Sequence, residues 1–247
     1  AADALGVDMD DIDVRMGDTD VIPQGMGTGG SRATAAGGSM VVSTTEALIE
    51  NGKKIAANIL EAAELDIEFS DGVFSIAGTD RTASWIDVAK ASFDDSLRPE
   101  DVEAGLLTTL ESTSYGQTFP NGCHICELEV DQATGAIEFL NYTIEDDIGR
   151  ILNPLTLEGQ ILGGAGQGVG QALYEEAVYD ETGQLVNASF MDYVMPRADN
   201  TPKFDFHFTE VPSPSNPLGV KGAGEAGSIG ATPAVANAII DALSPLG

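Results

Sequence analysis

A single carboxylate lies in a run of glycines and alanines in Gly219-Val220-Lys221-Gly222-Ala223-Gly224-Glu225-Ala226-Gly227-Ser228. Glycines let the backbone adopt positive φ and approach a ligand closely. The nearest cation along the chain is Lys221, four residues before Glu225. A carboxylate on such a loop, if closed off from water, holds its proton more tightly and suits general-base chemistry near neutral pH. From spacing alone, the segment is equally compatible with a tight connection in which Glu225 lies in solvent.

The residues after this loop predict a helix over 231–243. Thr232 is expected to be its N-cap and Pro233 its first helical residue. The loop would then end at a helix N-terminus, where free N–H groups favour an anion such as a phosphate.

A second glycine-rich segment, GMGTGGSRATAAGGS at 25–39, precedes a helix predicted over 40–61. Exposed backbone N–H groups, the hydroxyls of Ser31 and Thr34 and the guanidinium of Arg32 suit a phosphate or a carboxylate. The segment lacks the Gly-Lys-Ser/Thr ending of a P-loop and the Rossmann glycine spacing. It is therefore a plausible pyrophosphate cradle that matches neither standard motif.

The helical pattern LEGQILGGAGQGVGQALYEE, residues 157–176, contains many glycines. Each glycine costs a helix up to about 1 kcal/mol relative to alanine. Such a helix is tolerable if another helix or a ligand lies very close to its backbone. Gln160 and Gln167, seven residues apart, share one face of it.

The remaining patterns predict strands at 12–16, near 106–113, at 123–130, 136–145 and 204–211, hairpins at 65–75 and 178–185, and a helix over 84–91. Trp85 is expected to pack and His207 to face solvent. The fold class predicted is α+β, with mixed sheets, hairpins and glycine-initiated helices. Residues 1–247 are expected to form one region, with a possible sub-boundary near 62–114.

Composition narrows the function. The formal net charge of −29 excludes nucleic-acid binding by ordinary electrostatics. Nothing approaches eighteen consecutive apolar residues, so no membrane span is predicted. Cys123 and Cys126 lie on an alternating strand, which favours buried strand residues over a redox pair, and His124 is interpreted as structural. The start without Met and the abrupt end indicate a fragment or one piece of a split subunit.

The run GVKGAGEAGSIGATPAVANAIIDAL resembles the active-site loop of molybdenum-binding large subunits of the xanthine dehydrogenase family. That family includes aerobic carbon monoxide dehydrogenases and aldehyde oxidoreductases. Further similar phrases follow the family's order: GTGGSR at 27–32, FPNGCHICELEV at 119–130 and ASF-DY-MP within 188–196. The resemblance is densest at 17–61, 119–196 and 210–243.

The resemblance implies oxidative hydroxylation of a small substrate such as carbon monoxide, an aldehyde or an N-heterocycle, with oxygen supplied by water. Glu225 corresponds to the general base beside molybdenum, which molybdopterin holds, often as its cytosine dinucleotide. No metal ligand from the protein is implied. Cofactor contact is carried over to Ser31, Arg32, Ala33, Thr34, Gly37, Gln160, Gln167, Gly168, Lys221, Gly222 and Gly224.

The same resemblance implies partner subunits that carry [2Fe–2S] clusters and FAD, in a cytoplasmic dimer of heterotrimers. Two cysteines cannot ligate such a cluster within this chain. The loop that distinguishes substrates in the family lies upstream of this region, so the substrate cannot be read here. Two alternatives stay open: a non-catalytic split or degenerate subunit that holds cofactor or partners, and a nucleotide-binding module of unrelated chemistry.

Overall fold

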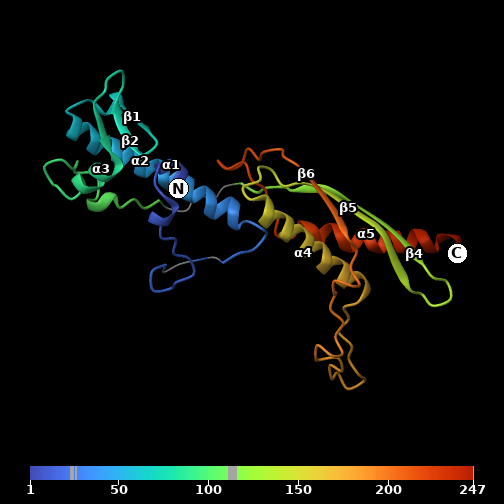
Figure 1. Cartoon of the computed structure of the whole chain (residues 1–247). Helices are drawn as coiled ribbons and strands as arrows, with labels where there is room; N and C mark the ends of the chain where they lie inside the picture. Colours follow the sequence, from blue (N-terminus) through green and yellow to red (C-terminus); the bar gives the residue numbers. More distant parts are fainter. Residues whose placement is uncertain (23–24, 26, 111–115, 247) are drawn as a thin grey trace. The chain divides into compact units, whose positions relative to one another are not determined.

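The computed structural model describes residues 1–22, 25, 27–110 and 116–246 (Figure 1). The chain divides into two compact units. Unit 1 comprises residues 1–27 and 36–114, and unit 2 comprises residues 28–35 and 115–247. Unit 2 is therefore discontinuous in sequence. The possible sub-boundary predicted near 62–114 covers only part of unit 1.

Unit 1 contains α1 (Ala2–Leu5), α2 (Ser39–Leu60), β1 (Ile67–Ser70), β2 (Val73–Ile76), β3 (Thr82–Ser84) and α3 (Trp85–Ala91). A turn of π-helix, Thr34–Gly38, leads into α2. The three strands form an antiparallel sheet in the order β1-β2-β3. This confirms the hairpin predicted at 65–75 and adds β3, which has no clear pattern of its own.

Large apolar side chains form the core of unit 1. Ile55, Phe74 and Val88 are fully buried. Trp85 stacks on Phe74 with ring centroids 5.6 Å apart, which confirms its packing role. Helix α3 begins with a capping box, in which the Ser84 hydroxyl accepts the backbone N–H of Asp87 and the Asp87 side chain accepts that of Ser84.

Two predicted strands of unit 1 are not found. Residues 12–16 follow a 3₁₀ turn at Met9–Asp11 and pair with no strand in the described part of the chain. Val14 and Met16 are largely exposed. Alternation of apolar and polar residues does not by itself form a strand, because the backbone must also hydrogen-bond to a neighbouring strand. The strand predicted near 106–113 lies partly outside the described residues. Its described portion, 107–110, has no regular structure and follows a 3₁₀ turn at Ala104–Leu106.

Unit 2 is a mixed three-stranded sheet covered by two helices. Strand β4 (Asn121–Val130) pairs antiparallel with β5 (Ile137–Asp147), and β6 (Phe204–Thr209) pairs parallel with β5. Helices α4 (Pro154–Leu173) and α5 (Ala226–Leu243) share a buried core with the sheet. The core includes Tyr142, Ile144, Ile161, Val169 and Val235. The β4–β5 hairpin, the 204–211 strand and the glycine-rich helix are confirmed, although α4 begins at Pro154, with Asn153 as its N-cap.

Helix α5 begins at Ala226, five residues before the predicted range of 231–243. Glu225 is its N-cap, so Thr232 does not cap it and Pro233 lies inside it. Thr232 instead donates its hydroxyl to the Gly168 carbonyl of α4 at 3.2 Å. Gly227, Ala231 and Val235 are buried, and this tertiary packing outweighs the Thr-Pro start signal and the backbone bond that Pro233 cannot make.

By length and composition alone, Ala226–Leu246, with a mean hydropathy of 1.2, also passes as a membrane span. Gly227 of this helix packs against the backbone of α4.

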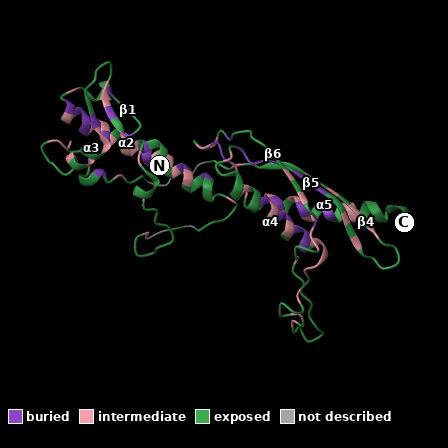
Figure 2. Ribbon diagram, in the orientation of Figure 1, coloured by how far each residue is buried: buried purple, intermediate pink, exposed green. Residues whose placement is uncertain are grey.

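The segment between α4 and β6 extends away from the sheet and helices of unit 2 (Figure 1), and most of it is exposed (Figure 2). The hairpin predicted at 178–185 is reduced there to one bridge, between Tyr179 and Leu185. On β6, His207 faces solvent as predicted and lies 3.2 Å from Asp205.

Candidate active site

The carboxylate of Glu225 lies where the two glycine-rich segments of unit 2 meet. The Ser31 hydroxyl donates to Glu225 Oε2 at 2.7 Å, across 194 positions of sequence. The backbone carbonyl of Glu225 accepts the Ser228 hydroxyl at 3.1 Å, in the first turn of α5. Glu225 itself is exposed in this chain. The sequence separately predicted a role for each segment, and the structure brings them together.

Glycine is required where these segments touch. A Cβ on Gly222 would lie 2.5 Å from the Ser31 carbonyl oxygen, and one on Gly224 would lie 3.0 Å from the Ser31 hydroxyl. From α4, the Gln160 side-chain amide donates to the Gly224 carbonyl at 3.0 Å. Three of the predicted segments therefore converge on the four residues before α5.

A cavity of about 470 Å³ lies beside this convergence, within the size range of ligand sites. Its polar lining includes hydroxyl, amide and cationic groups. The lining residues are Thr28, Ser31, Ala33, Thr34, Ile148, Arg150, Ile151, Leu152, Asn153, Thr156, Leu157, Gln160, Val220, Lys221, Ala223 and Gly224. Six residues of the predicted cofactor set are among them: Ser31, Ala33, Thr34, Gln160, Lys221 and Gly224.

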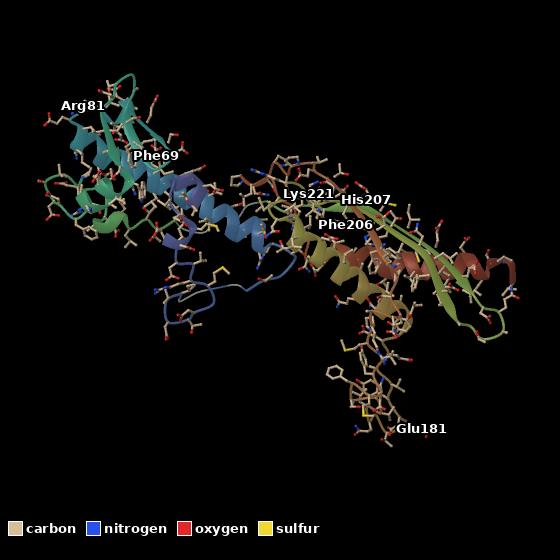
Figure 3. All side chains as sticks on the ribbon, viewed as in Figure 1. Phe69, Arg81, Glu181, Phe206, His207 and Lys221 are labelled. Atoms are coloured by element: carbon tan, nitrogen blue, oxygen red, sulfur yellow. The ribbon has the colours of Figure 1, made fainter. Side chains whose placement is uncertain are left out.

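Two cationic side chains line the cavity, and they differ in whether another residue already binds them. Lys221 Nζ lies 2.5 Å from Asp147 Oδ2, with its side chain 10% exposed (Figure 3). Arg150 is exposed and makes no ion pair within the part of the chain that the structure describes. Sequence reasoning missed Arg150. The available signal was its position just before the Asn153-Pro154 start of α4, where an anion is favoured.

Other predicted cofactor residues lie elsewhere. Gln167 lines a separate hollow of about 460 Å³ with Gly163, Met195 and Arg197. Gly168 packs against α5, where a Cβ would lie 2.7 Å from that of Ala231. Arg32 is exposed outside the cavity lining, and Gly37 belongs to unit 1. Gly222 contacts Ser31 at the loop, not in the lining.

His124 is structural, as predicted. Its side chain is 5% exposed, and Nδ1 lies 3.1 Å from the Tyr142 hydroxyl. Its ring lies against Gly230, where a Cβ would approach to 2.5 Å. The expectation that both cysteines are buried is wrong for Cys123, which strand alternation turns outward. Burial raises the pKa of the half-buried Cys126 thiol to about 11, which makes it unreactive.

The cavity suits an anionic cofactor with hydrogen-bonding rings. Arg150 and the hydroxyls of Thr28, Thr34 and Thr156 can hold phosphate oxygens, while the Gln160 amide and loop backbone can meet ring edges. Among the described residues, no three His, Cys, Asp or Glu side chains gather as a metal site.

Residues 1–202 match the family model of the molybdopterin cofactor-binding domain. The chain belongs to this family, which confirms the resemblance seen in its motifs.

The relatives specify the class further. The chain is 40% identical to the nicotine 6-hydroxylase large subunit of Paenarthrobacter nicotinovorans, covering 100% of this chain and 30% of that protein. It is 38% identical to the 6-hydroxypseudooxynicotine dehydrogenase complex subunit gamma of the same organism, covering 98% and 31%. Its fold matches reconstituted CO dehydrogenase from Oligotropha carboxidovorans with a TM-score of 0.89 and 34% identity, covering 100% and 30%. The α+β fold is thereby confirmed, and the chain spans just under a third of these relatives' length.

Proposed function

We propose that this chain is the part of a molybdenum hydroxylase large subunit that binds molybdopterin and supplies the general base, Glu225. One observation carries the proposal. The Ser31 hydroxyl, on one glycine-rich segment, binds the Glu225 carboxylate of the other at 2.7 Å, beside a cavity that Ser31 and Gly224 line. When bound, the molybdenum cofactor would accept the two electrons of the oxidation and carry the oxygen taken from water.

The chain's own residues would orient the base. Ser31 occupies Glu225 Oε2, and the hydrogen bonds among the described residues leave Oε1 open to accept a proton. Gln160 fixes the carbonyl of Gly224, the residue before the base. The position at the start of α5 fixes the backbone of Glu225. A base held from three directions needs little reorganisation when the proton moves.

The cofactor proposed is the cytosine dinucleotide form of molybdopterin, with its phosphates near Arg150 and the threonine hydroxyls. The relatives are named as a large subunit and as a subunit of a complex, and this supports partner subunits. We assign to those partners the [2Fe–2S] clusters and FAD that take the electrons onward, in a cytoplasmic dimer of heterotrimers. The substrate is a small molecule such as carbon monoxide, an aldehyde or an N-heterocycle.

The first experiment is metal and nucleotide analysis of the native complex. Molybdenum by mass spectrometry and CMP released by acid hydrolysis, both in amounts stoichiometric with this chain, are the expected results. Carefully prepared complex without molybdenum would contradict the catalytic proposal and favour a subunit that serves as scaffold.

Replacing the base tests its role directly. Glu225→Gln should lower kcat by roughly 10²–10⁴-fold, the usual contribution of a general base, because an amide cannot accept the proton. Molybdenum content should be unchanged, because Glu225 itself is not among the residues that line the cavity. Glu158→Gln, at an exposed position of α4, is the control and should keep normal turnover. Normal turnover in the Glu225 variant would exclude it as the base.

Replacing the free cation tests the cofactor contact. Arg150→Met should lower the CMP and molybdenum content of purified enzyme severalfold, because a charge-assisted phosphate contact is lost. Arg81→Met, at an exposed position of unit 1, is the matched control. Full cofactor occupancy in the Arg150 variant would place the phosphates elsewhere.

A further inference from the structure

Asp147, the last residue of β5, is a buried carboxylate that binds three donors. Oδ1 accepts the backbone N–H groups of Gly149 at 2.9 Å and Val211 at 3.1 Å. Oδ2 accepts the Lys221 ammonium at 2.5 Å. Its side chain is 11% exposed. Burial alone would raise the pKa of Asp147, but Lys221 and the two N–H groups outweigh burial and lower it, so the carboxylate is ionised at neutral pH.

The three donors belong to three separate segments of unit 2. Gly149 follows β5, Val211 follows β6, and Lys221 opens the glycine-rich loop that leads to Glu225. Because β5 and β6 are parallel, their carboxyl ends meet at one edge of the sheet. One carboxylate therefore joins both strand ends to the loop that carries the base.

The connection from this carboxylate to Glu225 is continuous. The backbone of Lys221 donates to the Ile148 carbonyl at 2.8 Å. Gly222 donates to the Thr118 hydroxyl at 3.1 Å and touches Ser31. The Gly224 carbonyl accepts Gln160, and Glu225 accepts Ser31. A shift of Lys221 would therefore displace the loop and the base together.

We propose that Asp147 is a positioning residue for Glu225, and that Lys221 is its structural counter-ion and does not bind the phosphates of a cofactor. The proposal rests on the proposed role of Glu225 as the base. The Lys221 ammonium is almost fully buried and already bound to a carboxylate. Turning it toward a phosphate would leave Asp147 as a buried charge without its cation, which is strongly unfavourable. Arg150 lines the same cavity and has no such partner among the described residues.

Two roles for Lys221 make opposite predictions for a pair of variants. Lys221→Met leaves the Asp147 carboxylate unpaired, whereas the double variant Asp147→Asn/Lys221→Met removes both charges and keeps an acceptor for Gly149 and Val211. If the pair positions the loop, the double variant is better than the single one. If Lys221 binds phosphate, the double variant is no better. Lys203→Met, an exposed lysine of unit 2, is the matched control.

The experiment uses the complete enzyme and measures kcat, KM, molybdenum and CMP content, and hydrogen–deuterium exchange of residues 216–225. For Lys221→Met we expect kcat to fall on the order of 10²-fold, as small misplacements of catalytic groups do. KM and cofactor content should be nearly unchanged, and exchange over 216–225 should be faster. The double variant should recover at least tenfold in kcat. The control should match the wild type in every measurement.

Loss of molybdenum and CMP in Lys221→Met, or a double variant no better than the single, would overturn the proposal. If Lys221→Met does not accumulate as folded enzyme, recovery of folded enzyme in the double variant supports the pair, and failure to recover contradicts it. The exchange measurement separates this proposal from the function on which it rests. Wild-type enzyme without molybdenum would refute only the proposed molybdenum hydroxylase function. Unchanged exchange in Lys221→Met would refute the proposal that the Asp147–Lys221 pair positions the loop.

Discussion

The two units of the chain differ in the kind of packing that stabilises each of them internally. Unit 1 packs bulky side chains: Phe74 is fully buried and contacts both Phe69 and Trp85. Unit 2 packs two helices through glycines: a Cβ on Gly227 of α5 would lie 2.2 Å from the Ile161 carbonyl oxygen of α4. The glycines lower helix propensity, but they bring the start of α5 close enough for Gln160 to reach the Gly224 carbonyl. Close backbone packing, and not core volume, is what positions the site.

The largest expected effect is a loss of stability in unit 1 when a buried aromatic ring is removed. Phe74→Ala should destabilise unit 1 by about 3–5 kcal/mol, because it removes a fully buried ring and leaves a cavity. Phe93→Ala, at a 72% exposed position of the same unit, should cost only about 0.5 kcal/mol or less. Calorimetric unfolding measures both. Equal costs would mean that the aromatic cluster does not hold unit 1 together.

A smaller loss of stability is expected in unit 2 when a methyl group is added where α5 packs against α4. Gly227→Ala should destabilise the protein by about 1–3 kcal/mol, because backbone atoms of α4 cannot move aside easily, and it should also lower kcat. In contrast, Gly159→Ala places a methyl where the structure has nothing within 4 Å. That control should be neutral or stabilising by up to about 1 kcal/mol. The same response at both glycines would refute the close approach.

A still smaller effect, which depends on pH, distinguishes two neighbouring buried carboxylates of unit 2, Asp146 and Asp147. Burial, and then the charge of Glu145, raises the pKa of Asp146 from 3.8 to about 6. Burial also lowers the pKa of the His124 imidazole, whose Nε2 lies 3.8 Å from Asp146 Oδ1. Both shifts disfavour the charged forms, so the pair is not a strong ion pair near pH 6. The Tyr142 hydroxyl is the third titratable group of this cluster.

The sign of the pH dependence follows from the raised pKa. Protonated Asp146 stabilises the fold fully below pH 3.8, and that contribution is lost as the pH rises to about 6. Asp146→Asn should therefore stabilise the protein above pH 6, on the order of 1–2 kcal/mol after relaxation around the site, with no gain near pH 4. Asp147→Asn should do the opposite and destabilise the protein at neutral pH. Denaturant unfolding at several pH values measures both, and a pH-independent effect of Asp146→Asn would contradict the raised pKa.

Much of this molecule could be predicted from local patterns. The hairpin at 65–75, the helix at 84–91 and the alternation of β4 and β5 depend on neighbouring residues, so the sequence shows them directly. The start of α5 could not be predicted, because packing of Gly227 against α4 overrides the local Thr-Pro signal. The strand predicted at 12–16 was wrong for the reverse reason, since its local pattern found no partner.

The site divides in the same way. Ser31, Gln160 and Glu225 were identified through their motifs, which resemble a known family. Gln167 had the same helical face as Gln160 but lines another hollow, because the loop before α5 reaches only the first turns of α4. The donors to Asp147, at 149, 211 and 221, are spread over the chain. No window of sequence contains that arrangement.

The hydrogen bond between Ser31 and Glu225 also has a consequence in time. Its two ends are separated by 194 positions. At translation rates of about 5–20 residues per second, Ser31 leaves the ribosome roughly ten to forty seconds before its partner exists. Unit 1, whose residues 36–114 lie between them, can fold in that interval, since contacts of short sequence separation form first. The contact between Ser31 and Glu225 can therefore form only after residues 36–114 have had time to fold.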